Sequence, residues 1–356
     1  MNLSIYSITM ANLVSVTKES RLILKIGGIT CGIILIIYII VKGGGLMRDL
    51  FFPKPPPAPL QAFGLLSHVA FPKLDSPAPI AQYNVNTIDG QLPKLPDRAN
   101  VYKLITPEPN LLALENAKNT LDALDFIENQ VKLSDILYRW TQSRTGIIIE
   151  YNIVTKNFSI SSDYRTNPFL AAQSMLPSEE EVVSDIQNYL SSIRSNITNI
   201  DFEKTKVEYL EQQNGVLVAA QNLGSTRFAR VTLMQKPIEE ISVVYPNPSS
   251  PILSFIISYP DGHFQILEGD FYNHIISSED KSDYPIKTAE QALEELKNGN
   301  AYVINPLSLP TVDITNVELK YYLSKDSNDF LLPVIVFTGI NFTAYVEAIP
   351  STSLQN

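Results

Sequence analysis

The sequence predicts an α+β protein with one membrane-spanning helix near its N-terminus, followed by two consecutive domains of helix plus antiparallel sheet. Two observations support this. An uncharged apolar run, Ile26–Val41, is closed by a lysine on each side. Beyond residue 99, segments with helical spacing of apolar residues are followed by runs in which apolar and polar residues alternate, which is typical of half-buried strands.

The apolar run is expected to cross a membrane. At about 1.5 Å per residue it covers roughly 24 Å as a helix, and Leu22–Leu24 with a snorkelling Lys25 extend it to the bilayer core of about 30 Å. A buried helix of a soluble protein is the alternative, but such a helix usually keeps a polar face, which this run lacks. We therefore expect a cytoplasmic tail at residues 1–20 and a transmembrane helix at 21–42 that ends at Gly43–Gly45.

The basic residues around the run give little preference for either orientation, because three precede it and three follow it: Lys18, Arg21, Lys25, Lys42, Arg48 and Lys54. A short first tail is readily held in the cytoplasm, and a long globular domain is translocated largely regardless of charge. The domains are therefore expected outside the cytoplasm. A cleaved signal peptide is the alternative, although the run lies far from Met1 and lacks a small-residue cleavage site.

Residues 43–98 are predicted to form a proline-rich spacer and an extended arm. The prolines between Pro53 and Pro59 favour polyproline II, a semi-rigid spacer of about 3.1 Å per residue. Short apolar pieces at Leu65–Leu66 and Val69–Phe71 suggest that the arm packs on the first domain.

The first α+β domain is expected at residues 99–236. A helix is predicted from Thr106 and Pro107, and a second from Ser178, where Glu181 completes a capping box. Strands are predicted at Ile147–Ile153 and Phe158–Ile160, which form a hairpin, and at Lys206–Glu211, Val216–Gln221 and Arg227–Met234, with an Asn214-Gly215 turn.

The second α+β domain is expected at residues 237–350, with a tail at 351–356. Thr288 and Gln291 cap its helix. Its predicted strands are Glu240–Tyr245, Ile252–Tyr259 and His263–Phe271, the last two joined by Asp261-Gly262, and then 317–323, 332–338 and 342–348. The order of a helix followed by an antiparallel meander thus recurs along the chain, but the amino-acid sequence itself is not repeated.

Four segments of the last third carry a resemblance to known proteins: Thr288–Gly299, Ile314–Tyr322, Phe330–Gly339 and Phe342–Ala348. They resemble the tandem regulatory domains of the YycH/YycI type and, more distantly, PepSY-like domains, and they are similar to uncharacterised single-pass bacterial envelope proteins. The resemblance implies a YycI-like second domain in a membrane-tethered protein outside the cytoplasmic membrane. It further implies regulation by binding, either of a sensor kinase or of a peptidase, and no catalytic motif.

Composition excludes several kinds of site. A net charge of −10 argues against a nucleic-acid partner, because phosphate binding needs a surplus of lysine and arginine. The single cysteine, Cys31, lies in the apolar run, so no intramolecular disulfide is possible. With three histidines and no metal-binding spacing, we expect no metal site and no cofactor. The best polar candidate for a site is His274, together with Asp270 and Asp283.

These features favour a non-enzymatic protein that contacts the lipid bilayer through its helix and binds an envelope protein or peptide through its domains. Exposed strands of such meanders can add a peptide by edge pairing. Two alternatives are a cell-envelope hydrolase with carboxylates gathered from distant parts of the chain, and a structural envelope spacer.

Overall fold

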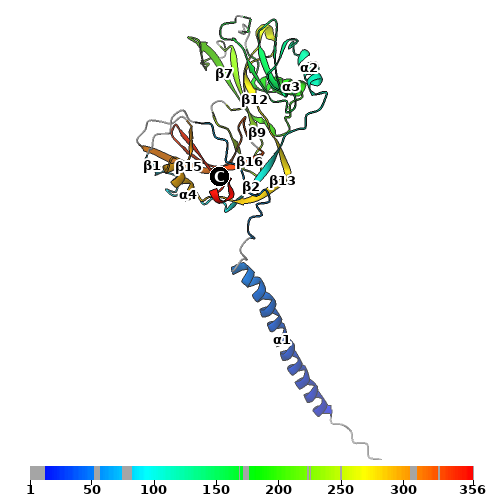
Figure 1. Ribbon diagram of the computed structural model, residues 1–356. Helices are drawn as coiled ribbons and strands as arrows, with labels where there is room; N and C mark the ends of the chain where they lie inside the picture. Colours follow the sequence, from blue (N-terminus) through cyan, green and yellow to red (C-terminus); the bar gives the residue numbers. More distant parts are fainter. Residues whose placement is uncertain are drawn as a thin grey trace, which may run out of the picture. The chain divides into compact units, whose positions relative to one another are not determined.

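The computed structural model describes residues 13–51, 57–73, 82–167, 169–170, 176–222, 224, 226–248, 251–304, 311–327 and 329–355. The chain divides into two compact units, Met1–Ala58 and Pro59–Asn356, which are described separately (Figure 1).

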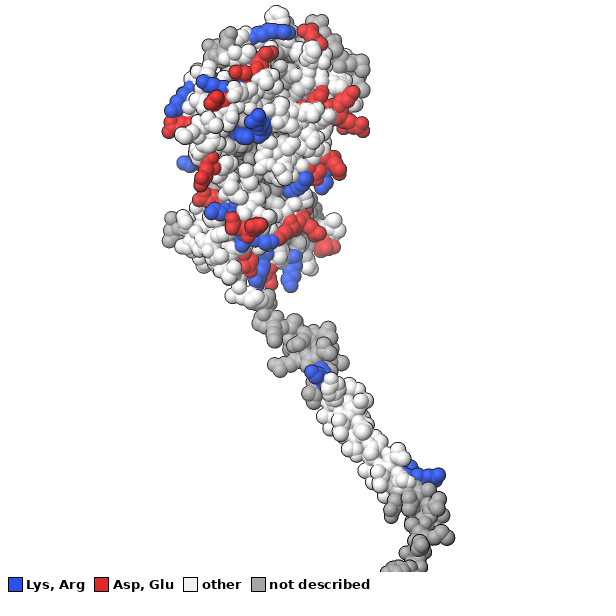
Figure 2. Space-filling model, turned by 90° about the vertical axis from the view of Figure 1, so that its right-hand side faces the viewer, with Lys and Arg blue, Asp and Glu red and all other residues white. Residues whose placement is uncertain are grey.

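The first unit is dominated by helix α1, Leu13–Phe51. Within the described residues it holds one stretch long and apolar enough to cross a membrane, Ser20–Ile39, and its large apolar side chains lie exposed. Figure 2 shows an uncharged surface along α1 between two groups of basic side chains.

The expected end of the helix at Gly43–Gly45 is wrong. Glycine weakens a helix but keeps its backbone N–H, so α1 continues to Phe51, shortly before Pro53, whose ring disfavours helical backbone at the preceding residue.

The second unit contains, in its described residues, a sheet of nine strands in the order β3-β4-β5-β6-β12-β11-β9-β7-β8. Their bounds are β3 Glu128–Lys132, β4 Leu137–Thr141, β5 Ile148–Asn152, β6 Phe158–Ser161, β7 Ile200–Gln213, β8 Val216–Ala219, β9 Phe228–Gln235, β11 Leu253–Ser258 and β12 Gln265–Phe271. Helices α2, Ala113–Asp122, and α3, Glu179–Ser192, contribute Leu121 and Ile186 to its core, which includes Trp140 and the stacked rings of Phe158 and Phe255.

The other sheet has eight strands in the described residues, built around β15, β16 and β17. The bounds are β1 Gln82–Val85, β2 Arg98–Ile105, β10 Val243–Val244, β13 Ile275–Pro285, β14 Tyr302–Ile304, β15 Thr311–Tyr322, β16 Phe330–Gly339 and β17 Phe342–Glu347. Helix α4, Ala289–Lys297, buries Ala292 and Leu296 in its core. Strands β1 and β10 pair with β15 in parallel, and the β15-β16-β17 meander is antiparallel.

Strand β2 of the eight-stranded sheet contributes side chains to both hydrophobic cores. Its Ala99 and Val101 lie in the core of the eight-stranded sheet, whereas Tyr102 and Leu104 lie in the core of the nine-stranded one. Because β2 pairs with β13 along most of its length, this antiparallel ladder connects both hydrophobic cores within one unit.

The structure confirms the α+β class and many local predictions. The Ser178–Glu181 and Thr288–Gln291 capping boxes are both present. The hairpin of β5 and β6 forms as expected, as do the β7–β8 and β11–β12 pairs and the last three strands. Each of these elements could be predicted because the cap or the alternating pattern that indicates it lies within one short stretch of sequence.

Two predicted elements differ from the structure. Helix α2 begins at Ala113 rather than near Thr106, because Pro109 disfavours helical backbone at Glu108 and the chain turns only at Asn110, whose side chain accepts from the Leu112 N–H at 3.0 Å. The strand expected at Glu240–Tyr245 is reduced to β10. Both Glu239 and Glu240 have positive φ angles, so the chain turns there instead of extending.

The arm and the last residues also depart from expectation. The arm packs into the eight-stranded sheet, which belongs largely to the second predicted domain: Leu66 lies in the core of that sheet, and Phe71 stacks on Tyr302 at a centroid distance of 5.5 Å. Residues 351–355 are not a loose tail, because Leu354 is buried and bridges Leu66. Apolar residues of the arm are covered by strands that lie far away in the sequence.

The expected division at residue 236 does not coincide with the division between the sheets. Strands β11 and β12, after residue 236, pair in the nine-stranded sheet, while β2, before it, pairs in the eight-stranded one. Part of the spacer, residues 52–56, lies outside the described residues, as do residues 1–12 of the tail.

Candidate functional site

The three predicted site residues lie at two separate places. Asp270, in β12, pairs with Lys325 at 2.6 Å, and the nearby His274 donates from Nε2 to the Ser324 carbonyl oxygen at 2.9 Å. Asp283, in β13, pairs with Arg98 at 2.8 Å. Among the described residues no hydrogen bond or ion pair joins the three to one another, so the structure does not assemble them into one site.

His274 and Asp270 connect the two sheets. Both contact the loop between β15 and β16, and Lys325 of that loop also lies over the Tyr272 ring, 4.7 Å from its centroid. Burial lowers the pKa of His274, because a charged imidazole loses its hydration there. The hydrogen bond from His274 to the Ser324 carbonyl oxygen is a structural contact between the sheets.

Asp283 holds the start of the folded unit. Its carboxylate accepts from the Leu60 N–H at 2.8 Å, and its carbonyl oxygen accepts from the Gln61 N–H at 3.1 Å. The Leu60 N–H, followed by Arg98, lowers the pKa of Asp283. The carboxylate therefore fixes the point at which the arm joins β13.

Acidic side chains on the face of the nine-stranded sheet opposite its helices are balanced by basic ones. Arg139 pairs with Glu150, Arg230 with Glu208 at 2.7 Å, and Arg165 with Glu268 at 3.6 Å. Within the described part of the chain no cluster of three potential metal ligands occurs. The carboxylates of this face are thus placed for cross-strand pairing.

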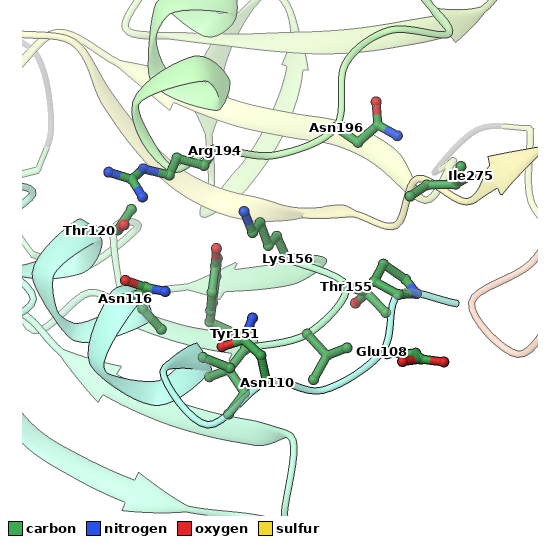
Figure 3. Close-up of a pocket in the computed structure, with 15 residues that line it drawn as sticks. Glu108, Asn110, Asn116, Thr120, Tyr151, Thr155, Lys156, Arg194, Asn196 and Ile275 are labelled. Carbon is green, nitrogen blue, oxygen red and sulfur yellow. The ribbon is translucent and has the colours of Figure 1, made fainter. Parts of the chain in front are cut away.

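A polar pocket of about 330 Å³ lies between α2, the β5–β6 turn and the end of α3 (Figure 3). This pocket was not predicted from the sequence, because its walls come from three turns or helix ends that are distant along the chain. Its polar lining includes Asn110, Asn116, Thr120, Lys156 and Arg194. At its base the buried Tyr151 donates its hydroxyl to the Ile193 carbonyl oxygen at 3.1 Å, and burial raises the pKa of Tyr151.

A larger groove, of about 850 Å³, lies where the two sheets approach each other. Thr232 and Met234 of β9 line it on one side, and Val243, Tyr245 and Tyr345 line it on the other. The volume is within the range of ligand-binding clefts, about 300–1,000 Å³. Its lining is mixed, and Glu208 and Arg230, which pair with each other, occupy one wall.

Strand β8 forms one edge of the nine-stranded sheet, and in the described residues it pairs only with β7. Its sequence, Val216–Ala219, contains no charge and no proline, and Val216 is 63% exposed. At the opposite edge Lys132, at the end of β3, pairs with Asp135 at 2.8 Å. Charges and prolines are the usual protection of an edge against further pairing, and β8 lacks both.

Comparison with known proteins gives limited similarity. No family model matches the chain, and no curated protein matches it. Among solved structures it is similar to the C-terminal domain of YpeB from Bacillus megaterium, with 14% identity over 70% of this chain and 96% of that one, at a TM-score of 0.28. It is also similar to YycH from Bacillus subtilis, with 10% identity over 70% of this chain and 52% of that one, at a TM-score of 0.31. The sequence-based resemblance described above names the same type of protein.

Proposed function

We propose that this protein is a single-pass, membrane-anchored binding protein that acts without catalysis. Its folded unit binds an extended segment of a partner protein outside the cytoplasmic membrane, and the segment adds to the nine-stranded sheet as a strand beside β8. The observation that carries the proposal is the unprotected apolar edge of β8.

The backbone of β8 offers hydrogen-bonding groups to a partner. The Ala220 N–H donates to the Tyr209 carbonyl oxygen at 2.9 Å, toward β7. Because backbone groups of neighbouring strand residues point in opposite directions, those of Leu217 and Ala219 point away from β7. An added strand gains affinity from these main-chain bonds, and the exposed Val216 contributes apolar contact area.

Helix α1 supports the membrane part of the proposal. Each large apolar side chain described between Leu22 and Ile39 is more than half exposed, so α1 itself does not cover this surface. A bilayer covers such a surface favourably, at about 25 cal/mol for each Å² of apolar area removed from water.

The test compares two substitutions at Ala219, an exposed position of β8. Ala219→Pro removes the outward N–H, whereas Ala219→Val keeps it and favours a strand. The full chain, solubilised in an uncharged detergent, is used to capture proteins from an envelope extract. We expect a partner that is recovered with the wild type and with Ala219→Val, and at least tenfold less with Ala219→Pro.

Thermal unfolding of the same preparations is the control, because Ala219→Pro must leave the fold intact for the comparison to apply. Equal recovery by a folded Ala219→Pro variant, or recovery of no protein by the wild type, contradicts the proposal. Loss of recovery with both variants would indicate a contact through the Ala219 side chain and would also contradict edge pairing.

A further inference from the structure

Lys156 lies at a turn position that usually carries glycine. It follows the turn between β5 and β6, its N–H donates to the Asn152 carbonyl oxygen at 2.8 Å, and its φ is +62°. Hairpin loops that end in a left-handed residue favour glycine or asparagine there, because a β-carbon is disfavoured in that conformation. A long cationic side chain is an uncommon choice at this position.

Arg194 occupies the equivalent position at the end of α3. The Ser195 N–H donates to the Leu190 carbonyl oxygen and the Arg194 N–H to that of Ser191, both at 3.0 Å, which is the Schellman pattern of a helix end. The φ of Arg194 is +56°, and the usual residue at this position is glycine. Two glycine-type positions from separate elements thus carry cations, and both cations line the same polar pocket.

Neither of the two charges has a carboxylate partner among the described residues. Neither Lys156 nor Arg194 forms an ion pair with a described residue, whereas the non-glycine, left-handed Glu239 is paired with Lys281. Figure 3 shows the Lys156 amine and the Arg194 guanidinium in the part of the pocket with Thr120 and Asn116, while Glu108 lies at the other end. The positive charge is therefore concentrated at one end of the pocket.

We propose that this end of the polar pocket binds an oxyanion, the carboxylate or phosphate group of a small ligand. Arg194 presents a planar fork of donors that matches either group, and Lys156 adds a second charge. The Asn116 amide and the Thr120 hydroxyl supply neutral donors in the same lining. Left-handed backbone at both cations is a local cost, and such costs are often retained at ligand sites.

This inference does not depend on the proposed role of β8, because the polar pocket contains no residue of that strand. Ala219→Pro should leave oxyanion binding unchanged, and pocket variants should leave partner recovery by β8 unchanged. Failure of one proposal can therefore be distinguished from failure of the other.

The experiment titrates the full chain in an uncharged detergent with N-acetylalanine, which carries a carboxylate, and separately with glycerol 3-phosphate, which carries a phosphate. Isothermal titration calorimetry measures the affinity for each probe. We expect saturable binding of at least one probe, and the probe that binds more tightly identifies the source of the oxyanion. Arg194→Asn and Lys156→Asn should each weaken that binding at least tenfold, while Lys118→Gln, at an exposed lysine of α2 outside the pocket, should not change it.

The melting temperatures of the same variants separate a binding role from a structural one. Asparagine adopts the left-handed conformation more readily than lysine or arginine, so both variants should melt at or above the wild-type temperature while losing affinity. The proposal is overturned if neither probe binds, if the asparagine variants bind as well as the wild type, or if they melt at a lower temperature. Arg194→Lys should restore part of the affinity through its charge.

Discussion

The half-buried His274 at the junction of the two sheets makes the stability of the fold depend on pH. Desolvation lowers the pKa of His274 in the folded protein below its value in the unfolded chain, which is about 6.5. Below that value the unfolded chain binds more protons than the folded one, and folding stability decreases as the pH falls. Above it the contribution of His274 to stability is fully present.

We expect His274→Gln to have a shallower loss of unfolding free energy than the wild type between about pH 7 and pH 5. Glutamine keeps a donor for the Ser324 carbonyl oxygen but has no titrating group. Urea unfolding at a series of pH values measures the slope. His263→Gln, at an exposed histidine of the β11–β12 turn, is the matched control for the replacement of one histidine by glutamine. Identical slopes for both variants would show that burial of His274 does not govern this pH range.

At the scale of elements, the ends of helix α3 have different roles. Its N-terminus is closed by reciprocal bonds between Ser178 and Glu181, and its C-terminus by the bonds around Arg194. The first closure contributes to stability. The second positions a cation at the polar pocket.

Ser178→Ala should lower the unfolding free energy by about 1 kcal/mol, because an N-cap hydroxyl that satisfies a backbone N–H is lost. Ser191→Ala, at an exposed position near the other end of the same helix, should change it by less than about 0.5 kcal/mol. Guanidinium unfolding followed by fluorescence of the buried Trp140, the one tryptophan in the sequence, measures both. Equal effects of the two substitutions would mean that the capping box does not determine the stability of α3.

The sequence was sufficient to predict elements whose signals are local. The cap at Ser178, the turn at Asn214-Gly215 and the alternation in β15 lie within a few residues, and the structure contains all three elements. Strand β2 and the strands on which the arm packs were not predicted, because both depend on partners more than one hundred residues away. The polar pocket was missed for the same reason. A basic residue at a position that needs a left-handed backbone, such as Lys156, was the signal that could have indicated it.

At the scale of the whole molecule, the sequence-based expectation is that residues 59–356 lie outside the cytoplasm. The unit Pro59–Asn356 contains no cysteine, and the single Cys31 lies in the apolar stretch of α1. A cysteine introduced into the folded unit can therefore be labelled selectively. Ile88 is fully exposed and suits this purpose.

Ile88→Cys should react with a membrane-impermeant maleimide in intact cells, to about the same extent as after permeabilisation. The wild-type chain is the control, because Cys31 should remain unlabelled inside a bilayer. Labelling of Ile88→Cys only after permeabilisation would place the folded unit in the cytoplasm and would contradict the proposed orientation.

The covering of the arm by residues 351–355 constrains when the folded unit can be completed during synthesis. Leu66 bridges Leu354, and the Gln355 amide donates to the Leu65 carbonyl oxygen across 290 positions of the sequence. Because Leu66 is synthesised long before Leu354, this bridge can form only after the strands between them have been made. The arm and residues 351–355 therefore complete the core of the eight-stranded sheet together, and a chain truncated before residue 351 loses the partner of Leu66 in this bridge.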